Sequence, residues 1–150
     1  MAAYFFVKMQ TSARNRFPGK VVGIKKGPIL AELEIEIGER TFLVAHISFT
    51  SVGDMGLSIG SLVQALVKSS QVILLAEEPP VRLSTRNCFC GAVSAIHGGA
   101  INTEVILQIQ KNLTIVAIVT NESARDLDLR VGKRFCAAFQ PSSVLLALPE

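Results

Sequence analysis

The chain has 150 residues, with 15 Lys and Arg against 12 Asp and Glu, giving a formal net charge of +3 at pH 7. Hydrophobic residues make up 49% of the sequence and charged residues 18%, which excludes intrinsic disorder because disorder requires low hydrophobicity and high net charge. This mild charge does not suit a protein that coats nucleic acid, but it is compatible with binding a small anion. The low charged fraction also favours self-association, and no apolar run approaches the roughly 18 residues of a membrane-spanning helix.

The sequence contains two copies of one unit. Ser12-Ala13-Arg14-Asn15 aligns with Ser84-Thr85-Arg86-Asn87, an offset of 72 residues that continues without a gap. Matched pairs later in the units include Gly27/Gly99, Val44/Val116, Asp54/Asp126, Gly60/Gly132 and Val72/Val144. A gapless register over a whole unit indicates a tandem duplication. We therefore predict one domain at residues 10–76 and a second at 83–150, separated by a boundary with paired prolines and acids.

Short strands dominate each predicted unit. In chain order, we expect strands at residues 17–24, 32–37, 41–48, 62–68 and 71–75 of the first unit. Residues 32–37 alternate strictly between Glu and an apolar residue, which is typical of a strand with one buried face. Residues 50–56 and 121–128 are the helical candidates, with Ser48 and Thr120, or Ser51 and Ser123, as N-caps. This pattern predicts an all-β fold of small closed or partly open barrels.

The sequence offers no recognisable catalytic machinery. His46 and His97 occupy different repeat positions, and neither lies in a nucleophile or zinc motif. No pair of carboxylates and no Ser/His/Asp set stands out. We therefore do not expect an enzyme.

The three cysteines are too few, and odd in number, for a disulfide framework, so we expect a reducing, cytoplasmic setting. Cys88 and Cys90 lie two residues apart on a predicted strand and face the same way, whereas Cys136 is distant in sequence. They could be thiolate ligands of a metal. We favour the simpler interpretation that each is a free, small buried hydrophobe, since the first unit has no cysteine at the equivalent positions.

Single-stranded nucleic acid is a weaker alternative, because small barrels often bind it. Such binding needs exposed aromatic residues along a basic groove. The chain has no Trp, one Tyr and eight Phe, and Phe17 and Phe89 recur in phase with strand alternation, as core residues do. Nucleic-acid binding is therefore not expected.

Hydrogen-bond donors do recur between the units. They are the opening Ser-x-Arg-Asn, the hydroxyl pair at the start of the short helix, and Lys68-Ser69-Ser70, which becomes Gln140-Pro141-Ser142. Each alone has an ordinary role as a cap, a turn or an exposed charge. Together they form a set of donors that suits a small, fully ionised oxyanion, because such an anion has only acceptor oxygens.

The motif Ser-Ala-Arg-Asn-x-Phe-x-Gly-x-Val-x-x-Ile-x-x-Gly, followed by Val-Ala-x-Ile, Leu-x-x-Gly and Lys-Ser-Ser-x-Val-Ile-Leu, resembles the molbindin (Mop) or TOBE family. The resemblance covers about residues 10–150, and the tandem arrangement is similar to that of the di-Mop molbindins. It implies two tandem five-stranded Mop barrels related to the OB-fold, each with one short helix. It also implies a cytoplasmic molybdate-binding protein, a homotrimer and molybdate sites between units.

The resemblance assigns oxyanion ligands by position. One set would be Ser12, Arg14, Lys68 and Ser69, faced by Ser48 and Ser51 of a neighbouring unit; the other would be Ser84, Arg86 and Ser142, faced by Thr120 and Ser123. Two departures from the family pattern matter. Gln140 stands where the first unit has Lys68, which removes a positive charge. The family turn Gly-Ala-x-Asn-x-Glu is intact at residues 99–104 but has Leu30 in place of Asn in the first unit.

The expected function is therefore binding of molybdate, and of tungstate as well, for molybdenum storage and homeostasis, with no organic cofactor, no membrane and no cationic metal ligands. The alternative is a molybdate-sensing module that acts through a partner protein, since the chain has no helix-turn-helix or Walker motif of its own.

Overall fold

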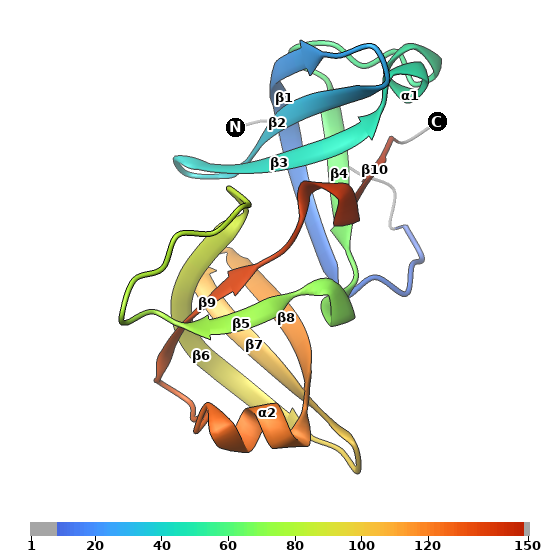
Figure 1. Ribbon diagram of the computed structural model, residues 1–150. Coiled ribbons are helices and arrows are strands. Elements are labelled where there is room, and N and C mark those ends of the chain that lie inside the picture. Colours follow the sequence, from blue (N-terminus) through green and yellow to red (C-terminus); the bar gives the residue numbers. More distant parts are fainter. Residues whose placement is uncertain (1–8, 149–150) are drawn as a thin grey trace. The chain divides into compact units, whose positions relative to one another are not determined.

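The computed structural model describes residues 9–148 (Figure 1). In chain order, the elements of the first repeat are β1 (Asn15–Lys26), β2 (Leu30–Gly38), β3 (Thr41–Ser48), α1 (Phe49–Asp54), β4 (Leu62–Val67), the 3₁₀ turn η1 (Ser69–Gln71) and β5 (Ile73–Ala76). Those of the second repeat are β6 (Cys88–Gly98), β7 (Asn102–Gln110), β8 (Leu113–Thr120), α2 (Asn121–Asp126), β9 (Arg134–Ala138), the 3₁₀ turn η2 (Pro141–Ser143) and β10 (Val144–Ala147). The all-β prediction is confirmed.

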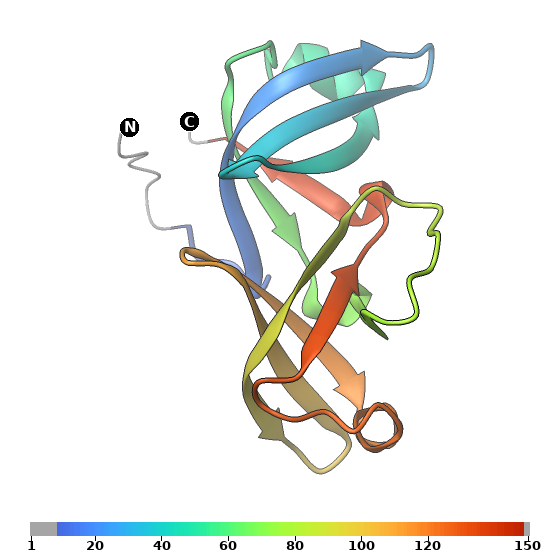
Figure 2. The ribbon, with the colours of Figure 1, turned by 90° about the vertical axis from the view of Figure 1, so that its left-hand side faces the viewer.

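The strands form two five-stranded sheets, ordered β10-β4-β1-β2-β3 and β5-β9-β6-β7-β8. In the first sheet β3 also packs against η2 and β10, and in the second β8 packs against η1 and β5. Each sheet therefore curls until its edge strands meet, as in a small barrel. Figure 2 shows the curl of β6, β7 and β8 in the second sheet, with α2 directly after β8.

The last short strand of each repeat is exchanged. β5, from the first repeat, pairs with β9, and β10, from the second, pairs with β4. Of the described residues, 9–67 and 141–148 make up one compact unit, and 68–140 make up the other. The units thus differ from the contiguous segments 10–76 and 83–150, because residues 68–76 and 141–148 change places.

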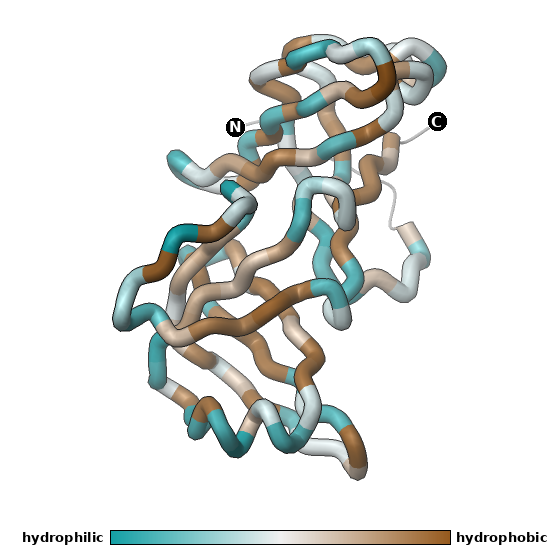
Figure 3. The backbone as a smooth tube through the Cα atoms, viewed as in Figure 1, coloured by the Kyte–Doolittle hydropathy of each residue, from teal (hydrophilic) through white to brown (hydrophobic). Residues whose placement is uncertain are grey.

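Alternation along the strands builds the core of each unit. Phe17, Val21, Leu33 and Ile35 are buried in the first unit, and their counterparts are buried in the second. Figure 3 shows hydrophobic stretches, in brown, along the strands of both units. Phe17 and Phe89 are core residues, as predicted. The predicted strand at 71–75 begins only at Ile73, because the backbone turns through η1 first. Within residues 9–148 there is no helix long and apolar enough to cross a membrane.

Candidate functional site

One end of the first sheet gathers several predicted ligand positions. Asn15 of β1 is in register with Val67 of β4, which is in register with Val144 of β10. Arg14 directly precedes Asn15, and Ser142 lies two residues before Val144. Lys68 directly follows Val67. The strand register therefore brings the ends of three strands that carry these residues to one level of the sheet.

The second sheet has the same arrangement at the equivalent end. Cys88 is in register with Ala138, and Ala138 with Ile73 of β5. Asn87 is fully buried, and its carbonyl accepts a 3.2 Å hydrogen bond from the amide of Phe139. Arg86 and Gln140 therefore extend from neighbouring strands, with an arginine and a neutral amide where the first repeat has Arg14 and Lys68.

Exposure divides the predicted ligands. Ser69 is buried, with 4% of its surface accessible, and Ser51 and Ser123 are half-buried. All the others are exposed: Ser12, Arg14, Ser48, Lys68, Ser84, Arg86, Thr120 and Ser142. Most of the donor set is thus available to a ligand from solvent.

The hydroxyl pairs lie at the N-termini of the two short helices. Ser48 Oγ accepts a 3.1 Å hydrogen bond from the amide of Ser51, and Thr120 Oγ1 accepts one of the same length from Ser123. The N-caps are thus Ser48 and Thr120. In each pair the hydroxyls also bond each other, at 2.6 Å and 2.9 Å. Because each of these hydroxyls is both donor and acceptor, a cap can hold the backbone while its pair still offers an O–H to a ligand.

Within the first unit, Arg14 and the hydroxyl pair of Ser48 and Ser51 lie at opposite ends of β1. Arg14 precedes the first residue of β1. Ser48 pairs with Leu30 at the start of β2, beside the end of β1 (Figure 1). The 12-residue strand between them corresponds to roughly 35 Å of extended chain. Register along the sheet therefore does not bring Arg14 and Ser48 of one unit together.

The turn that varies between the repeats keeps its backbone geometry. Gly27 donates a 2.8 Å hydrogen bond to the carbonyl of Leu30, and Gly99 donates an equal one to Asn102. Replacement of Asn by Leu30 therefore leaves the turn intact. An open hollow of about 460 Å³ lies beside this turn in the second unit, lined among others by Gly99, Asn121 and Arg125; none of the predicted ligand residues lines it.

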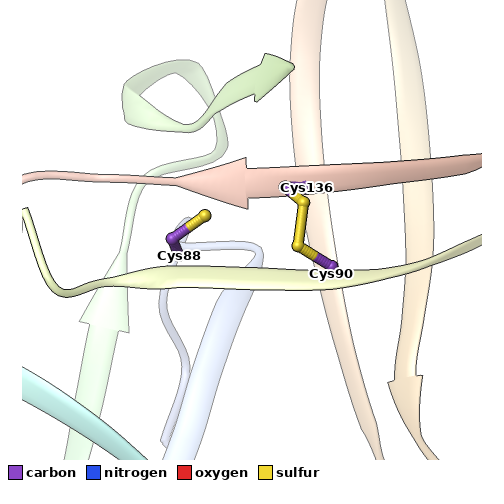
Figure 4. Close-up of side chains that lie close together, drawn as sticks. All are labelled: Cys88, Cys90 and Cys136. Atoms are coloured by element: carbon purple, nitrogen blue, oxygen red, sulfur yellow. A yellow bond between two sulfur atoms is a disulfide. The ribbon is translucent and has the colours of Figure 1, made fainter. Parts of the chain in front are cut away.

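The interpretation of the cysteines as separate buried hydrophobes is wrong. Cys90 lies opposite Cys136 in the β6–β9 register, and a disulfide joins them. Cys88 is a half-buried free thiol, and the three Sγ atoms lie within 4.8 Å of one another (Figure 4). Burial raises the pKa of the Cys88 thiol. Sequence reasoning missed this pair because strand register sets it. Pro18 and Gln64, the first-repeat counterparts of Cys90 and Cys136, are paired in the same way.

One ion pair links β9 to the segment after β5. Arg134 Nε donates a 2.6 Å hydrogen bond to a carboxylate oxygen of Glu77. This bond, with the charge of the guanidinium, lowers the pKa of Glu77 below its usual value and raises that of Arg134. The pair lies outside the predicted ligand set.

Comparison with known proteins places these features in a family. The TOBE domain matches the chain twice, over residues 11–74 and 83–146. The chain belongs to the TOBE domain family. The sequence resemblance to molbindin and TOBE proteins is thereby confirmed.

Several relatives of this chain are molybdenum proteins by name. It is 39% identical over 142 residues to the molybdenum transport protein ModE of Azotobacter vinelandii, covering 95% of this chain and 52% of that protein. It is 38% identical over 141 residues to the molybdenum-pterin-binding protein MopA of Rhodobacter capsulatus, covering 94% and 53%. The chain spans about half the length of these curated relatives.

The solved structures include a protein similar over nearly the whole chain. The crystal structure of the cytoplasmic molybdate-binding protein ModG, in a form with molybdate bound, superposes with a TM-score of 0.90 at 37% identity. The match covers 94% of this chain and all of that one. The tandem arrangement and both curled sheets are therefore shared with ModG.

Proposed function

We propose that this protein binds molybdate. The observation that carries the proposal is the similarity along the full length of ModG, whose structure was determined with molybdate bound. The fold of a binding protein does not by itself fix the ligand, but here the similarity coincides with a recurrent set of hydrogen-bond donors in both repeats.

The chemistry of the donors supports a tetrahedral oxyanion. Arg14, Lys68 and the serine hydroxyls supply N–H and O–H groups, and charge-assisted hydrogen bonds to an oxyanion are stronger than neutral ones. Ser48 and Ser51 add hydroxyls on a separate part of the unit. We propose that Ser12, Arg14, Lys68 and Ser142, which the strand exchange brings to one end of the first sheet, hold one face of an anion, and that Ser48 and Ser51 of a neighbouring unit hold the other. Ser84, Arg86 and Ser69, faced by Thr120 and Ser123, would form the second set.

Such shared sites require an assembly, and we propose a homotrimer. Apolar side chains that are between 63% and 77% exposed occur at matching positions of the two repeats: Ile29 and Ile101, Ile59 and Val131, and Ile73 and Leu145. Exposed apolar residues are common singly, but their recurrence at three repeat positions favours burial against other copies of the chain. The oligomeric state can be measured by sedimentation equilibrium with and without molybdate.

In this proposal the cellular role is storage and homeostasis of molybdate in the cytoplasm, with tungstate bound as well because its oxyanion has the same charge and shape. No covalent chemistry is involved, and the protein is not an enzyme. Selectivity against sulfate would depend on the size of the proposed site, since all three anions present only acceptor oxygens.

Calorimetric titration of metal-free protein with molybdate, tungstate and sulfate tests the proposal. We expect saturable heat with molybdate and tungstate and none with sulfate. Arg14→Ala should weaken molybdate binding at least tenfold, whereas Lys111→Ala, which removes an exposed cation from the β7–β8 turn, should not. Equal effects of the two substitutions would contradict the proposed site, and the absence of heat with every anion would contradict the function.

A sensing role is the second candidate, favoured by the match of 95% of this chain to about half of ModE from Azotobacter vinelandii. In that case molybdate would control binding to a partner protein. Isolation of the untagged protein from cells grown with and without molybdate distinguishes the roles. A stoichiometric partner whose binding depends on molybdate would favour sensing, and its absence in both conditions would favour storage.

A further inference from the structure

The three cysteines of the second unit form a cluster that anion binding does not use. Cys88 and Cys90 are two residues apart on β6, so both side chains project from the same face of the sheet, while Phe89 between them is buried in the core. Cys136 lies on β9 directly opposite Cys90. Figure 4 shows the sulfur of Cys88 directed from β6 toward β9, on the same side as the disulfide.

We propose that Cys88, Cys90 and Cys136, when the disulfide is reduced, form a three-thiolate site for a soft cation, with Cu(I) as its best match. Thiolates are the ligands that soft cations such as Cu(I) prefer. Three sulfurs around one cation at a metal–sulfur distance of about 2.3 Å would be about 4.0 Å apart. The three sulfurs already lie within 4.8 Å of one another, so side-chain rotations suffice to bring them to that spacing.

The composition of the cluster favours Cu(I) over Zn²⁺. Zinc in a structural site takes four protein ligands. Among the described residues, the cluster contains these three sulfurs and no His, Asp or Glu. The neighbouring positions are small or apolar, since Ala138 faces Cys88 and Leu75 faces Cys136. Arg134, two residues from Cys136, is bonded to Glu77, so its positive charge near the cation is offset.

Occupancy of the site would depend on redox state. An external dithiol supplies two electrons and two protons, converting the Cys90–Cys136 disulfide into two thiols while the dithiol itself becomes a disulfide. Cu(I) then binds as the thiols release their protons. An external disulfide that takes up two electrons and two protons, and so becomes a dithiol, would oxidise Cys90 and Cys136 back to their disulfide. Only Cys88 then remains as a ligand, so the cation would be released. The cation site and the oxyanion residues share no side chain, so one can fail without the other.

The test is anaerobic competition for Cu(I) between the full chain, reduced with a dithiol and then desalted, and the chromophoric chelator bathocuproine disulfonate. We expect one Cu(I) per reduced chain. The oxidised chain should retain less than a tenth of it at the same chelator concentration. Cys88→Ser should lower the affinity at least tenfold while leaving molybdate binding and the Cys90–Cys136 pair unchanged.

Two controls keep the result decisive. His97→Ala removes an exposed side chain of β6 that could bind copper without the cluster, and it should have no effect. Copper K-edge X-ray absorption on the copper-loaded chain should report three sulfur neighbours per copper. A reduced chain that binds no better than a Cys88→Ser, Cys90→Ser, Cys136→Ser variant would overturn the proposal, as would Cu(I) affinity unchanged by Cys88→Ser. Circular dichroism of each variant checks that it is folded.

Discussion

The hydroxyl of Thr103 donates a 2.6 Å hydrogen bond to the side-chain oxygen of Asn121, whose amide nitrogen in turn donates a 2.9 Å bond to the carbonyl of Gly99. Asn121 is the first residue of α2, so these bonds tie the helix to β7 and to the turn before it. The first repeat has Ala31 and Phe49 at the positions of Thr103 and Asn121 and therefore lacks both bonds. The two units thus hold the same helix in different ways.

Asn121→Ala should destabilise the protein by about 1–3 kcal/mol, because it leaves the buried hydroxyl of Thr103 without its acceptor. Denaturation with urea measures the change. The double variant Thr103→Ala, Asn121→Phe introduces the residues of the first repeat. Its loss of stability should be smaller than the summed losses of Thr103→Ala and Asn121→Phe made singly. Unchanged stability of Asn121→Ala would show that the bonds contribute nothing.

A second stability prediction concerns a close approach of two strands. A Cβ atom at Gly91 would overlap the carbonyl oxygen of Gln108, a backbone atom of β7 that cannot move without shifting the strand. Gly91→Ala should therefore cost about 1–3 kcal/mol. Gly98→Ala, at the end of the same strand with nothing within 4 Å, is the matched control and should be close to neutral. Similar unfolding midpoints for the two variants would refute the steric explanation.

Much of this fold could be predicted from local sequence patterns that recur in the two repeats. Alternation over residues 32–37 indicated β2. The sequence offered two sets of N-caps, Ser48 with Thr120 or Ser51 with Ser123, and the structure has the first set. The exchange of β5 and β10 could not be predicted, because the two segments match at the 72-residue offset and fit either sheet. Strand register, rather than spacing along the sequence, brings Cys136 beside Cys90.

The sequence predicts a candidate site as a set of residues but not as an arrangement. The repeated motifs suggest Arg14 and Ser48 by the donor groups that they carry, and their role in binding stays a prediction. Register along β1 separates them within a unit, so a site that uses both would have to combine residues of different units, a combination on which local sequence patterns carry no information.

Acid pH should weaken the Glu77–Arg134 pair. Because the folded-state pKa of Glu77 lies below its usual value, the pair stabilises the folded protein above that usual pKa and is lost as pH falls through the folded value. Glu77→Gln should thus lower the melting temperature slightly at neutral pH, and the difference should shrink as the pH falls below the usual pKa of a glutamate. The pair is solvent-exposed, so high salt should remove the difference. A salt-independent difference would assign the effect to packing.

Replacement of Gln140 tests whether the missing positive charge lowers the molybdate affinity of the second proposed site below that of the first. Gln140→Lys restores at this position the cation that Lys68 supplies in the first repeat. A charge-assisted hydrogen bond contributes about 1.5–3 kcal/mol, so molybdate should bind the second set of residues at least tenfold more tightly. Calorimetry would show the weaker class of sites converging on the stronger one. Asn112→Lys, which adds the same charge at an exposed turn, is the control and should leave both classes unchanged.

Ser48→Asp separates the structural role of the cap from its proposed role as a ligand. Asp is as good an N-cap as Ser, so the bond to the amide of Ser51 is retained and stability should stay within about 0.5 kcal/mol of the parent. A carboxylate has no proton to donate at neutral pH and repels a dianion, so molybdate affinity at the sites that use Ser48 should fall at least tenfold. Ser58→Asp adds the same charge at another exposed position and should bind normally. Full molybdate binding by a folded Ser48→Asp variant would remove Ser48, and the neighbouring-unit arrangement with it, from the proposed site.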